Sequence, residues 1–566
     1  MKLHNKRNIN IRFIIWVSIM LTHILIINNN LSAQYQQEWI KKVSGTGSNS
    51  ADYGNNIAFD KQNNVYVAGY VQNSGTYLDY FLIKYTPAGQ TIWSKTYNGT
   101  SNNDDHLISL AVDDVGNAYV IGYSSWSNAG ADCVTIKYDS SGNLKWVGIY
   151  GLGDTLNNFG KEVKVDNNKN VYVFCQSSYD FNNEDDYLLI KYDSLGLQKW
   201  VRRCRGANVY NSASDMVLDK SGNIYITGSS IAFPSGWDFL TLKYSPNGDS
   251  LWSRRYDNNE LSDSPTEMAI DSMGNICITG YSINTSINST SITTIKYDSS
   301  GVLLWDRKYK NNSLNPSDLG NNIGIDRYNN IYVAGYSTIG PDVFTNRDYI
   351  TIRYNPNGDT SWVRRYNSPA NNYDWLYKLT IDRQCNVFVT GSSYGSSGNA
   401  DYFTISYDTL GNVFWSHRYN GPSNNNDNAY YLALDNAQNL YVTGSSYENA
   451  TGVDFVTIKY SKNVGIQNIN ENIPDNYVLF QNYPNPFNPT TKIRFDVPRL
   501  RGIGVLTTTL RIFDITGREI QKLVNERLNP GTYEVSFNGI TLSSGVYFYQ
   551  LSSEDFVETK KMFLLK

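Results

Sequence analysis

The chain has 566 residues, 40% of them hydrophobic and 18% charged, which is enough for one large and one small folded domain. Its formal net charge is −4, and loss of the four basic residues among the first 33 would leave about −8, so no nucleic-acid partner is expected. The five cysteines are scattered and odd in number, which predicts buried small side chains and not a disulfide framework.

Residues 1–33 have the pattern of a secretory signal peptide. Basic residues precede an apolar run from Phe13 to Ile27, and Leu31-Ser32-Ala33 offers small residues for cleavage before Gln34. The apolar run is short and interrupted by polar residues, so we do not expect it to span a membrane. The mature chain is therefore expected to leave the cytoplasm and to contain no transmembrane segment.

Residues 34–461 repeat one pattern eight times. Each copy opens with Asp, has Asn four residues later and continues into a β-branched and aromatic run, as in Asp113 to Tyr123. A second run ending in Tyr and a Gly turn leading to Trp follow, and successive Trp residues are 52 to 57 residues apart. A period of this length with several strands in each unit is typical of propeller blades and not of helical solenoids.

Four strands can be placed in each repeat, because Val, Ile, Tyr and Trp fill the runs. In the first repeat they are Ile57-Ala58-Phe59, Val65 to Ala68, Phe81 to Tyr85 and Thr91 to Tyr97. The eighth copy stops at Tyr460 without a Trp strand, whereas an unpartnered strand, Glu38 to Val43, precedes the first copy. We therefore predict an all-β fold, an eight-bladed β-propeller closed by the N-terminal strand. An open solenoid is the alternative.

The predicted connections are of two kinds. Those from strand one to two and from three to four are tight turns, while the other two sets are longer, differ among copies and should emerge on one face. Trp126, Trp237 and Trp375 break the repeat and lie in or beside these loops, where exposed rings can stack on sugars or apolar ligands. Alternatively, they fill gaps beneath the loops. Weaker candidates of the same kind are Tyr179, Phe233, Phe344, Tyr394 and Tyr447.

Acidic residues suggest scaffold more than chemistry. The Asp and Asn that open each repeat lack the acidic density of a calcium loop, so they are interpreted as caps of a tight turn. Asp104-Asp105 and Glu184-Asp185-Asp186 are interpreted as solvated loop charge, with a structural cation as the alternative. Outside the leader only His106 and His417 are histidines, so no metal site and no Ser-His-Asp site is predicted. No cofactor is predicted, although structural calcium remains possible.

After Tyr460 the repeat stops. Residues 462–474 are interpreted as a linker, and residues 475–566 as a separate unit of short alternating strands. This unit contains the motif Tyr483-Pro484-Asn485-Pro486-Phe487-Asn488-Pro489. By itself the Pro-Asn-Pro core predicts only a stiff turn.

Both units resemble known families. Residues 34–461 resemble the SBBP propeller repeats through the D-x-x-G-N-x-Y-V-x-G core and the D-Y-x-x-I-K-Y third strand, which implies an extracellular scaffold without a particular chemistry. Residues 475–566 closely resemble the type A C-terminal sorting domain of the type IX secretion system. That resemblance implies a small β-sandwich that directs export across the outer membrane of Bacteroidetes-like bacteria, with the secretion machinery as partner and cell-surface attachment or release afterwards.

Three classes of function remain open. The first is a secreted or cell-surface propeller that binds glycan or protein, which the long-loop face and the export signals favour. The second is a polysaccharide lyase or hydrolase, which would need two loop carboxylates facing each other across the ring. No catalytic constellation is visible, so a non-enzyme is predicted. The third is a purely structural surface protein, in which the long-loop face would be as polar and regular as the other.

Overall fold

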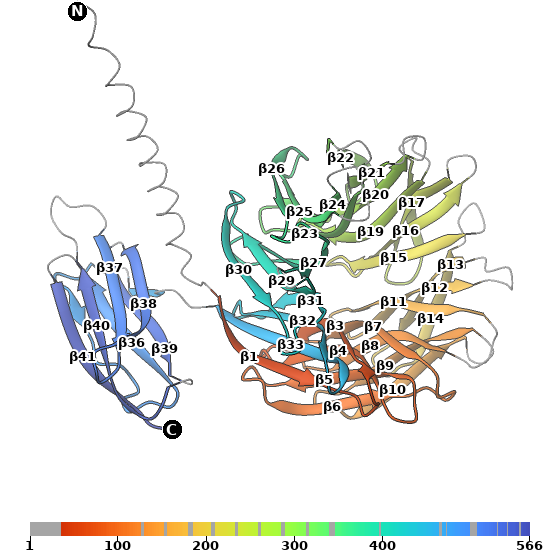
Figure 1. Ribbon diagram of the computed structural model, residues 1–566. Coiled ribbons are helices and arrows are strands. Elements are labelled where there is room, and N and C mark those ends of the chain that lie inside the picture. Colours follow the sequence, from red (N-terminus) through yellow and green to blue (C-terminus); the bar gives the residue numbers. More distant parts are fainter. Residues whose placement is uncertain are drawn as a thin grey trace, which may run out of the picture. The chain divides into compact units, whose positions relative to one another are not determined.

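The computed structural model describes most of the chain from Tyr35 onward (Figure 1). The described residues are 35–125, 130–151, 156–178, 185–204, 210–232, 236–257, 262–284, 289–312, 316–338, 346–395, 398–462, 467–470, 473–498, 506–528, 530–539, 542–553 and 556–566. They form two compact units, one from Tyr35 to Ser461 and one that contains Lys462 to Lys566. Every described element is a β-strand, so the all-β prediction is confirmed. No helix in the described residues is long and apolar enough to cross a bilayer.

The first unit is a succession of four-stranded antiparallel sheets, numbered here 1 to 8 in chain order. Sheets 1 to 4 consist of β3 (Tyr53–Phe59), β4 (Val65–Gln72), β5 (Leu78–Tyr85) and β6 (Thr91–Tyr97); β7 (Asp105–Val112), β8 (Ala118–Ser125), β9 (Ala131–Tyr138) and β10 (Leu144–Tyr150); β11 (Asn158–Val165), β12 (Val171–Ser178), β13 (Asp185–Tyr192) and β14 (Gln198–Cys204); and β15 (Asn211–Leu218), β16 (Ile224–Ala232), β17 (Gly236–Tyr244) and β18 (Ser250–Tyr256).

Sheets 5 to 8 consist of β19 (Ser262–Ile270), β20 (Ile276–Asn284), β21 (Ser289–Tyr297) and β22 (Leu303–Tyr309); β23 (Asp318–Ile325), β24 (Ile331–Thr338), β25 (Arg347–Tyr354) and β26 (Thr360–Tyr366); β27 (Asp374–Ile381), β28 (Val387–Tyr394), β29 (Ala400–Tyr407) and β30 (Val413–Tyr419); and β31 (Asp427–Leu434), β32 (Leu440–Glu448) and β33 (Gly452–Lys462) with β1 (Tyr35–Val43). The short β2 (Ser50–Ala51) also pairs with β33, and one parallel bridge, Trp237 to Ser262, joins sheets 4 and 5.

The strands of the first repeat lie where the sequence predicts them, but three of the four are longer. The fourth, β6, has the predicted bounds, whereas β3 begins four residues earlier, at Tyr53, and β4 ends four residues later, at Gln72, with a glycine among the added residues of each strand. The antiparallel ladder continues through these residues with a bulge between Gly54 and Asn56. Main-chain hydrogen bonds do not depend on apolar side chains, so the apolar pattern underestimates strand length.

Asx caps hold the turn between the first two strands of every sheet. Asp60 Oδ1 accepts hydrogen bonds from the main-chain amides of Gln62 (3.0 Å) and Asn64 (2.9 Å), and Asp60 Oδ2 accepts one from Asn64 Nδ2 (2.8 Å). The two bonds from Asn recur at Asp113, Asp166, Asp219, Asp271, Asp326, Asp382 and Asp435. The predicted capping role is confirmed.

The Trp of the fourth strand donates a hydrogen bond to the next sheet at every junction except that of sheets 2 and 3, where Trp146 Nε1 is buried without a hydrogen-bond partner among the described residues. Trp93 Nε1 donates to the carbonyl of Ser140 in a turn of sheet 2 at 3.1 Å. The series continues to Trp415 Nε1, which donates to the Tyr35 carbonyl of β1 (2.9 Å), and to Trp39 Nε1 of β1, which donates to the Pro87 carbonyl of sheet 1 (3.2 Å). Strand β1 is also hydrogen-bonded to β33, so it supplies sheet 8 with its Trp strand.

The first strands of the eight sheets lie side by side, in the order β3, β7, β11, β15, β19, β23, β27 and β31, and β31 in turn packs against β3 (Figure 1). We call these eight the inner strands. The second and third strands are almost entirely buried, and the apolar clusters contain side chains from two neighbouring sheets, as Tyr119 and Ile121 of sheet 2 pack with Val173 and Leu188 of sheet 3. Stacking of sheet on sheet therefore makes the core.

The second unit has two four-stranded sheets. Their strands are β34 (Gln467–Asn470), β35 (Val478–Leu479), β36 (Thr490–Val497), β37 (Leu506–Phe513), β38 (Glu519–Leu528), β39 (Gly531–Asn538), β40 (Gly545–Ser553) and β41 (Phe556–Leu564), in the orders β34-β39-β36-β35 and β38-β37-β40-β41. Both sheets contribute to one buried cluster, for example through Phe495 of β36 and Leu551 of β40.

The predicted motif from Tyr483 to Pro489 lies between β35 and β36 in this unit. Phe487 is 1% exposed, its amide donates to the Phe563 carbonyl (2.9 Å), and its carbonyl accepts from the Leu565 amide (3.0 Å). Asn485 Oδ1 accepts from the Phe563 amide at 2.9 Å. The motif thus packs across the last strand, while Tyr483 points outward and is 80% exposed.

Candidate functional site

The two ends of the sheets differ. The turns from strand one to two and from three to four all span five residues, such as 60–64 and 86–90, whereas the connections at the other end range from three residues (449–451) to eight (310–317). The predicted variation among these connections is therefore confirmed, but the prediction that all of them are longer is wrong, because 233–235 and 449–451 have only three residues. The varied end is the place where binding residues are expected.

At this varied end the inner strands present aromatic side chains. Each inner strand has a buried Asp or Asn at or just before its start, and the next residue is Tyr53, His106, Phe159 or Trp375 in sheets 1, 2, 3 and 7. Tyr53 pairs with Tyr70 of β4, and His106 pairs with Tyr123 of β8. Antiparallel pairing thus places a second ring from the neighbouring strand beside the first.

Nine rings form an unbroken series, which we call the aromatic belt. In order they are Tyr336, Trp375, Tyr377, Tyr430, Tyr53, Tyr70, His106, Tyr123 and Phe159, and successive ring centroids are 5.1, 6.3, 5.1, 6.1, 5.1, 4.8, 4.9 and 4.9 Å apart. These separations are typical of interacting aromatic pairs. The belt extends over six sheets, from sheet 6 through sheets 7, 8, 1 and 2 to sheet 3.

Eight of the nine belt rings are half-buried, and only Tyr336 is buried. The guanidinium of Arg347 lies 4.4 Å from the ring centroid of Trp375 and 4.7 Å from that of Tyr336, in cation–π contact with both. Burial lowers the pKa of His106, so this imidazole is neutral at pH 7. The belt therefore presents aromatic faces with one cation at its sheet 6 end.

Sheets 4 and 5 interrupt the belt. Their inner strands have Ser212 and Ser264 in place of the aromatic residue. Further along the inner strands lies a group of five charged side chains, which we call the charged group: Glu162, Lys164, Asp215, Glu267 and Lys378. The three carboxylates belong to β11, which carries the last belt ring, and to β15 and β19 of the sheets that interrupt the belt.

The charged group is paired internally. Lys164 Nζ lies 2.5 Å from Glu162 Oε1, and Lys378 Nζ forms an ion pair with Glu267 Oε1. Asp215 accepts hydrogen bonds from the main-chain amides of Met216 (2.7 Å) and Met268 (2.8 Å). Burial, followed by the charges of Glu162 and Glu267, raises the pKa of Asp215 to about 7 against the opposing effect of Lys164. Burial and the neighbouring carboxyl groups thus favour the protonated form of Asp215.

The structure places the predicted tryptophans differently from one another. Trp375 is a member of the aromatic belt. Trp237 lies in β17, the third strand of sheet 4, where it pairs with Ile231 and is half-buried. Trp126 lies outside the described residues, as do Tyr179, Phe233 and Phe344. Tyr394 and Tyr447 lie at the varied ends of β28 and β32, and the ring of Tyr394 is 6.2 Å from that of Tyr373.

Sequence reasoning missed most of the belt and the whole charged group. Tyr53, Tyr70 and Tyr123 stand in strands, where aromatic residues are common and carry no special signal. An alignment of the eight repeats would have shown the difference at the residue that follows the Asp or Asn near the start of strand one. Four repeats have Tyr, His, Phe or Trp there, and the other four have Ser, Leu or Asn.

The interpretation of the acidic loop clusters as solvated charge is wrong for two residues. Asp105 is fully buried, accepts a hydrogen bond from the Gly99 amide at 2.6 Å and has its pKa raised to about 6, first by burial. Asp186 is also buried and pairs with Arg203 at 3.3 Å. Both residues are 0% exposed, and their partners lie in the adjoining connection (Gly99) or in the same sheet (Arg203).

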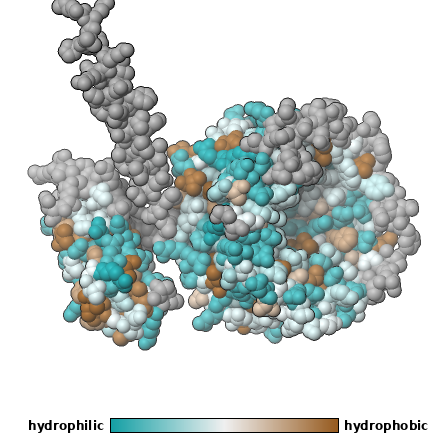
Figure 2. Space-filling view, in the orientation of Figure 1, coloured by the Kyte–Doolittle hydropathy of each residue, from teal (hydrophilic) through white to brown (hydrophobic). Residues whose placement is uncertain are grey.

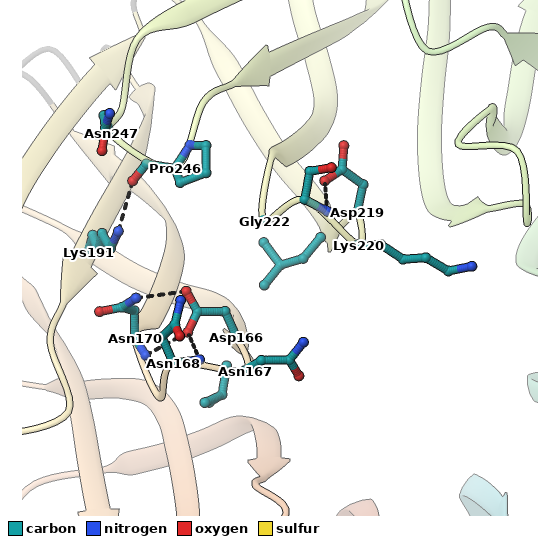
Figure 3. A pocket seen from close by; sticks show the side chains of 13 residues that line it. Asp166, Asn167, Asn168, Asn170, Lys191, Asp219, Lys220, Gly222, Pro246 and Asn247 are labelled. Carbon is teal, nitrogen blue, oxygen red and sulfur yellow. Dashed lines mark hydrogen bonds between the residues drawn. The ribbon is translucent and has the colours of Figure 1, made fainter.

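One pocket of about 430 Å³ lies between sheets 3 and 4, at the regular end of the sheets (Figure 3). Its polar groups are engaged by the repeat itself: Asp166 caps its own turn, and Lys191 Nζ donates to the Pro246 carbonyl at 2.8 Å (Figure 3). The same lysine contact recurs from Lys84 to Ser140 and from Lys243 to Ser299. We therefore assign this pocket to the scaffold.

The exposed apolar residues of the first unit do not suggest a second site. Leu195, Met273 and Leu410 are more than 60% exposed, but each lies in a separate turn. On the face seen in Figure 2, hydrophobic residues of this unit are scattered among hydrophilic ones. Scattered apolar residues of this kind are normal on a protein surface.

Family models match both units. The model described as a beta-propeller repeat, SBBP, matches residues 38–71 and 314–341, and the model described as a secretion system C-terminal sorting domain matches residues 481–565. The chain contains SBBP beta-propeller repeats and a type IX C-terminal sorting domain. The sorting domain implies that this SBBP-repeat protein interacts with the type IX secretion machinery and is exported to the cell surface or the medium.

No curated protein matches this SBBP-repeat protein. Among solved structures it is similar to a fungal alcohol oxidase of the AA5 family in complex with copper (11% identity, TM-score 0.34, 81% of this chain and 96% of that one) and to a PL25 ulvan lyase (12%, 0.37, 61% and 90%). It is also similar to the beta-propeller domain of the Trilobed protease from Pyrococcus furiosus (9% identity, TM-score 0.34, 66% of this chain and 97% of that one). Similarities this distant say nothing about function.

Proposed function

We propose that this protein is a secreted or cell-surface propeller whose aromatic belt binds a glycan. The observation that carries the proposal is the unbroken series of nine rings at the varied end of the inner strands, eight of them half-buried. Half-exposed Tyr and Trp rings offer flat apolar faces and a polar edge, which suits the faces of sugar rings. Protein is the alternative ligand.

The finer architecture belongs to the same proposal. We infer that the eight sheets are the blades of one closed ring, completed in sheet 8 by the N-terminal strand, and that the C-terminal unit is a β-sandwich. The pairing of β1 with β33, the Trp39 bond to Pro87 and the contact between β3 and β31 support closure. The shared cluster of the two C-terminal sheets supports the sandwich. Residues 1–33, outside the described part, are proposed to be the signal peptide for the step into the periplasm.

The test is a binding screen of the mature chain on immobilised polysaccharides, with and without calcium. Replacing one stacking ring should weaken retention about threefold to tenfold, because an aromatic contact contributes about 0.5–1.5 kcal/mol. Trp375→Ala removes a ring near one end of the belt and Tyr53→Ala removes its middle ring, and both should weaken binding. Trp237→Ala is the matched control, because this equally half-buried Trp lies on a third strand.

Two outcomes would contradict the glycan proposal. If no immobilised polysaccharide retains the protein, a protein partner or a structural role becomes the favoured function. If Trp237→Ala weakens retention while Trp375→Ala and Tyr53→Ala do not, binding occurs away from the belt.

A second candidate function is polysaccharide cleavage, favoured by the raised pKa of Asp215 beside Glu162 and Glu267. A carboxyl whose pKa is raised toward 7 beside two further carboxyl groups is an arrangement that suits general acid catalysis. The same screen would then release new reducing ends, and Asp215→Asn should abolish that release while leaving retention intact. Retention without release would leave binding as the function.

A further inference from the structure

Two of the scattered cysteines meet in the structure. Cys133 Sγ of β9 lies 2.9 Å from Cys175 Sγ of β12, and the two side chains are 1% and 0% exposed. They belong to different sheets, 2 and 3, and lie in one buried cluster with Val173 and Leu188. The two cysteines are buried, as the sequence predicts, but their scattered positions along the chain gave no sign that they meet.

The internal repeats show what normally occupies these two places. The position of Cys133, directly after the Asp of the third strand, is a large side chain in every other sheet: Tyr80, Tyr187, Phe239, Ile292, Tyr349, Tyr402 and Phe455. The position of Cys175, the fifth residue of the second strand, is glycine in every other sheet: Gly69, Gly122, Gly228, Gly280, Gly335, Gly391 and Gly444.

The glycine is crowded by the main chain of the first strand and, at several junctions, by the large side chain as well. A Cβ at Gly228 would lie 2.2 Å from the Ser212 carbonyl oxygen, and one at Gly391 would lie 2.0 Å from that of Trp375. The same Cβ atoms would lie 2.6 Å from Tyr187 Oη and 2.8 Å from Tyr349 Oη, and one at Gly280 would lie 2.8 Å from Phe239 Cζ. Changing the glycine alone would therefore produce a clash, and shrinking the aromatic alone would leave a cavity. Between sheets 2 and 3 both positions differ together, and both are cysteine.

The protein is exported, so this pair leaves the reducing cytoplasm. Disulfides form and persist in the periplasm and at the cell surface. A disulfide needs a sulfur separation of about 2.05 Å, so the two Sγ atoms have to approach by a little less than 1 Å. We propose that Cys133 and Cys175 form a disulfide that links sheets 2 and 3 in the exported protein.

The reaction is a two-electron oxidation. Both Sγ–H bonds break, one Sγ–Sγ bond forms, and two protons and two electrons leave the pair. The acceptor is the disulfide of a periplasmic thiol oxidoreductase, which is reduced to its dithiol. One cysteine thiolate attacks that disulfide to give a mixed disulfide, and the second displaces the oxidoreductase.

Oxidation has to precede the final packing of the two sheets. Neither sulfur is accessible once sheet 3 covers sheet 2, and burial raises the pKa of the Cys175 thiol well above its usual value, which removes the reactive thiolate. In protein that has already folded in the cytoplasm, the two thiols should therefore form the disulfide only slowly when a thiol oxidant is added later.

The test is to collect the full-length exported protein from the producing cells, denature it without reductant, and alkylate its free thiols. The expected result is alkylation of Cys204, Cys277 and Cys385 only. Trypsin digestion should give one linked peptide pair, residues 96–137 with residues 170–191, that separates on reduction. Alkylation of all five cysteines, or linkage of Cys133 to a different cysteine, would overturn the proposal.

Three variants make the result specific. Cys277→Ser, at another fully buried cysteine, should keep the linked pair. Cys133→Ser should lose it and make Cys175 reactive after denaturation. The double variant Cys133→Tyr with Cys175→Gly restores the large side chain and the glycine that occupy these positions in the other sheets, so it should fold. Reductant should lower the unfolding temperature of the wild type but not of this double variant, and an equal response of the two would overturn the structural role of the bond.

Discussion

The charged residues that recur from sheet to sheet are paired with one another within the scaffold. In sheets 3, 4, 6 and 7 the Asp that begins the third strand pairs with an Arg of the fourth, as Asp238 does with Arg255 (2.8 Å) and Asp401 with Arg418 (3.0 Å). The Lys before the third-strand Tyr instead pairs with the capping Asp of its own sheet, as Lys84 does with Asp60 (3.2 Å). It also donates a hydrogen bond to a turn of the next sheet, as Lys84 does to the Ser140 carbonyl. The recurring charges are scaffold, as the sequence suggested.

Asp374 offers a pH test of this scaffold. Burial and the neighbouring Asp348 raise its pKa to about 6, while its unfolded value is near 3.8. The native state thus binds more protons than the unfolded chain between about pH 4 and pH 6, so the free energy of unfolding falls as pH rises through that window.

We expect Asp374→Asn to remove this loss and to stabilise the protein at about pH 8 relative to wild type, by up to about 1.4 kcal/mol for each unit of the pKa shift. Asparagine already stands at the equivalent positions 158 and 211, so the variant should fold. Denaturant unfolding at about pH 5 and pH 8 measures the effect. A variant that is less stable than wild type at both values would show that the carboxylate is needed ionised.

At the scale of elements, β1 decides how the first unit ends. It gives β33 a hydrogen-bonded neighbour, and Trp415 and Trp39 connect it to sheets 7 and 1. Without β1 the edge of β33 would be exposed, and exposed edges pair with other chains.

We predict that deletion of residues 35–43 lowers the unfolding temperature and makes the protein aggregate in light-scattering measurements. Trp39→Phe is the milder control: it removes one hydrogen bond and should cost about 1 kcal/mol without aggregation. If the deletion leaves both the unfolding temperature and the monomeric state unchanged, β1 does not close the unit.

At the scale of the molecule, the two units have separate tasks: the repeats present a surface, and the C-terminal unit directs export. We expect a chain without residues 475–566 to stay in the periplasm, where cell fractionation would detect it. Arrival of the shortened chain in the medium or on the surface would contradict this division. Replacing Phe487, the buried anchor of the motif, with Ala should unfold the C-terminal unit and have the same effect on export.

The sequence by itself determined the repeat, the order of its strands, the capped turns, the varied end and the sorting domain. All of these are local patterns. An Asp with an Asn four residues later acts within one turn, and a run of apolar residues acts within one strand. The sequence could not show that Tyr377 meets Tyr430, that Asp215 lies among Glu162 and Glu267, or that Cys133 meets Cys175. These groups come from different sheets, more than forty residues apart in most cases, and only the packing of sheet on sheet and the return of β31 to β3 brings them together.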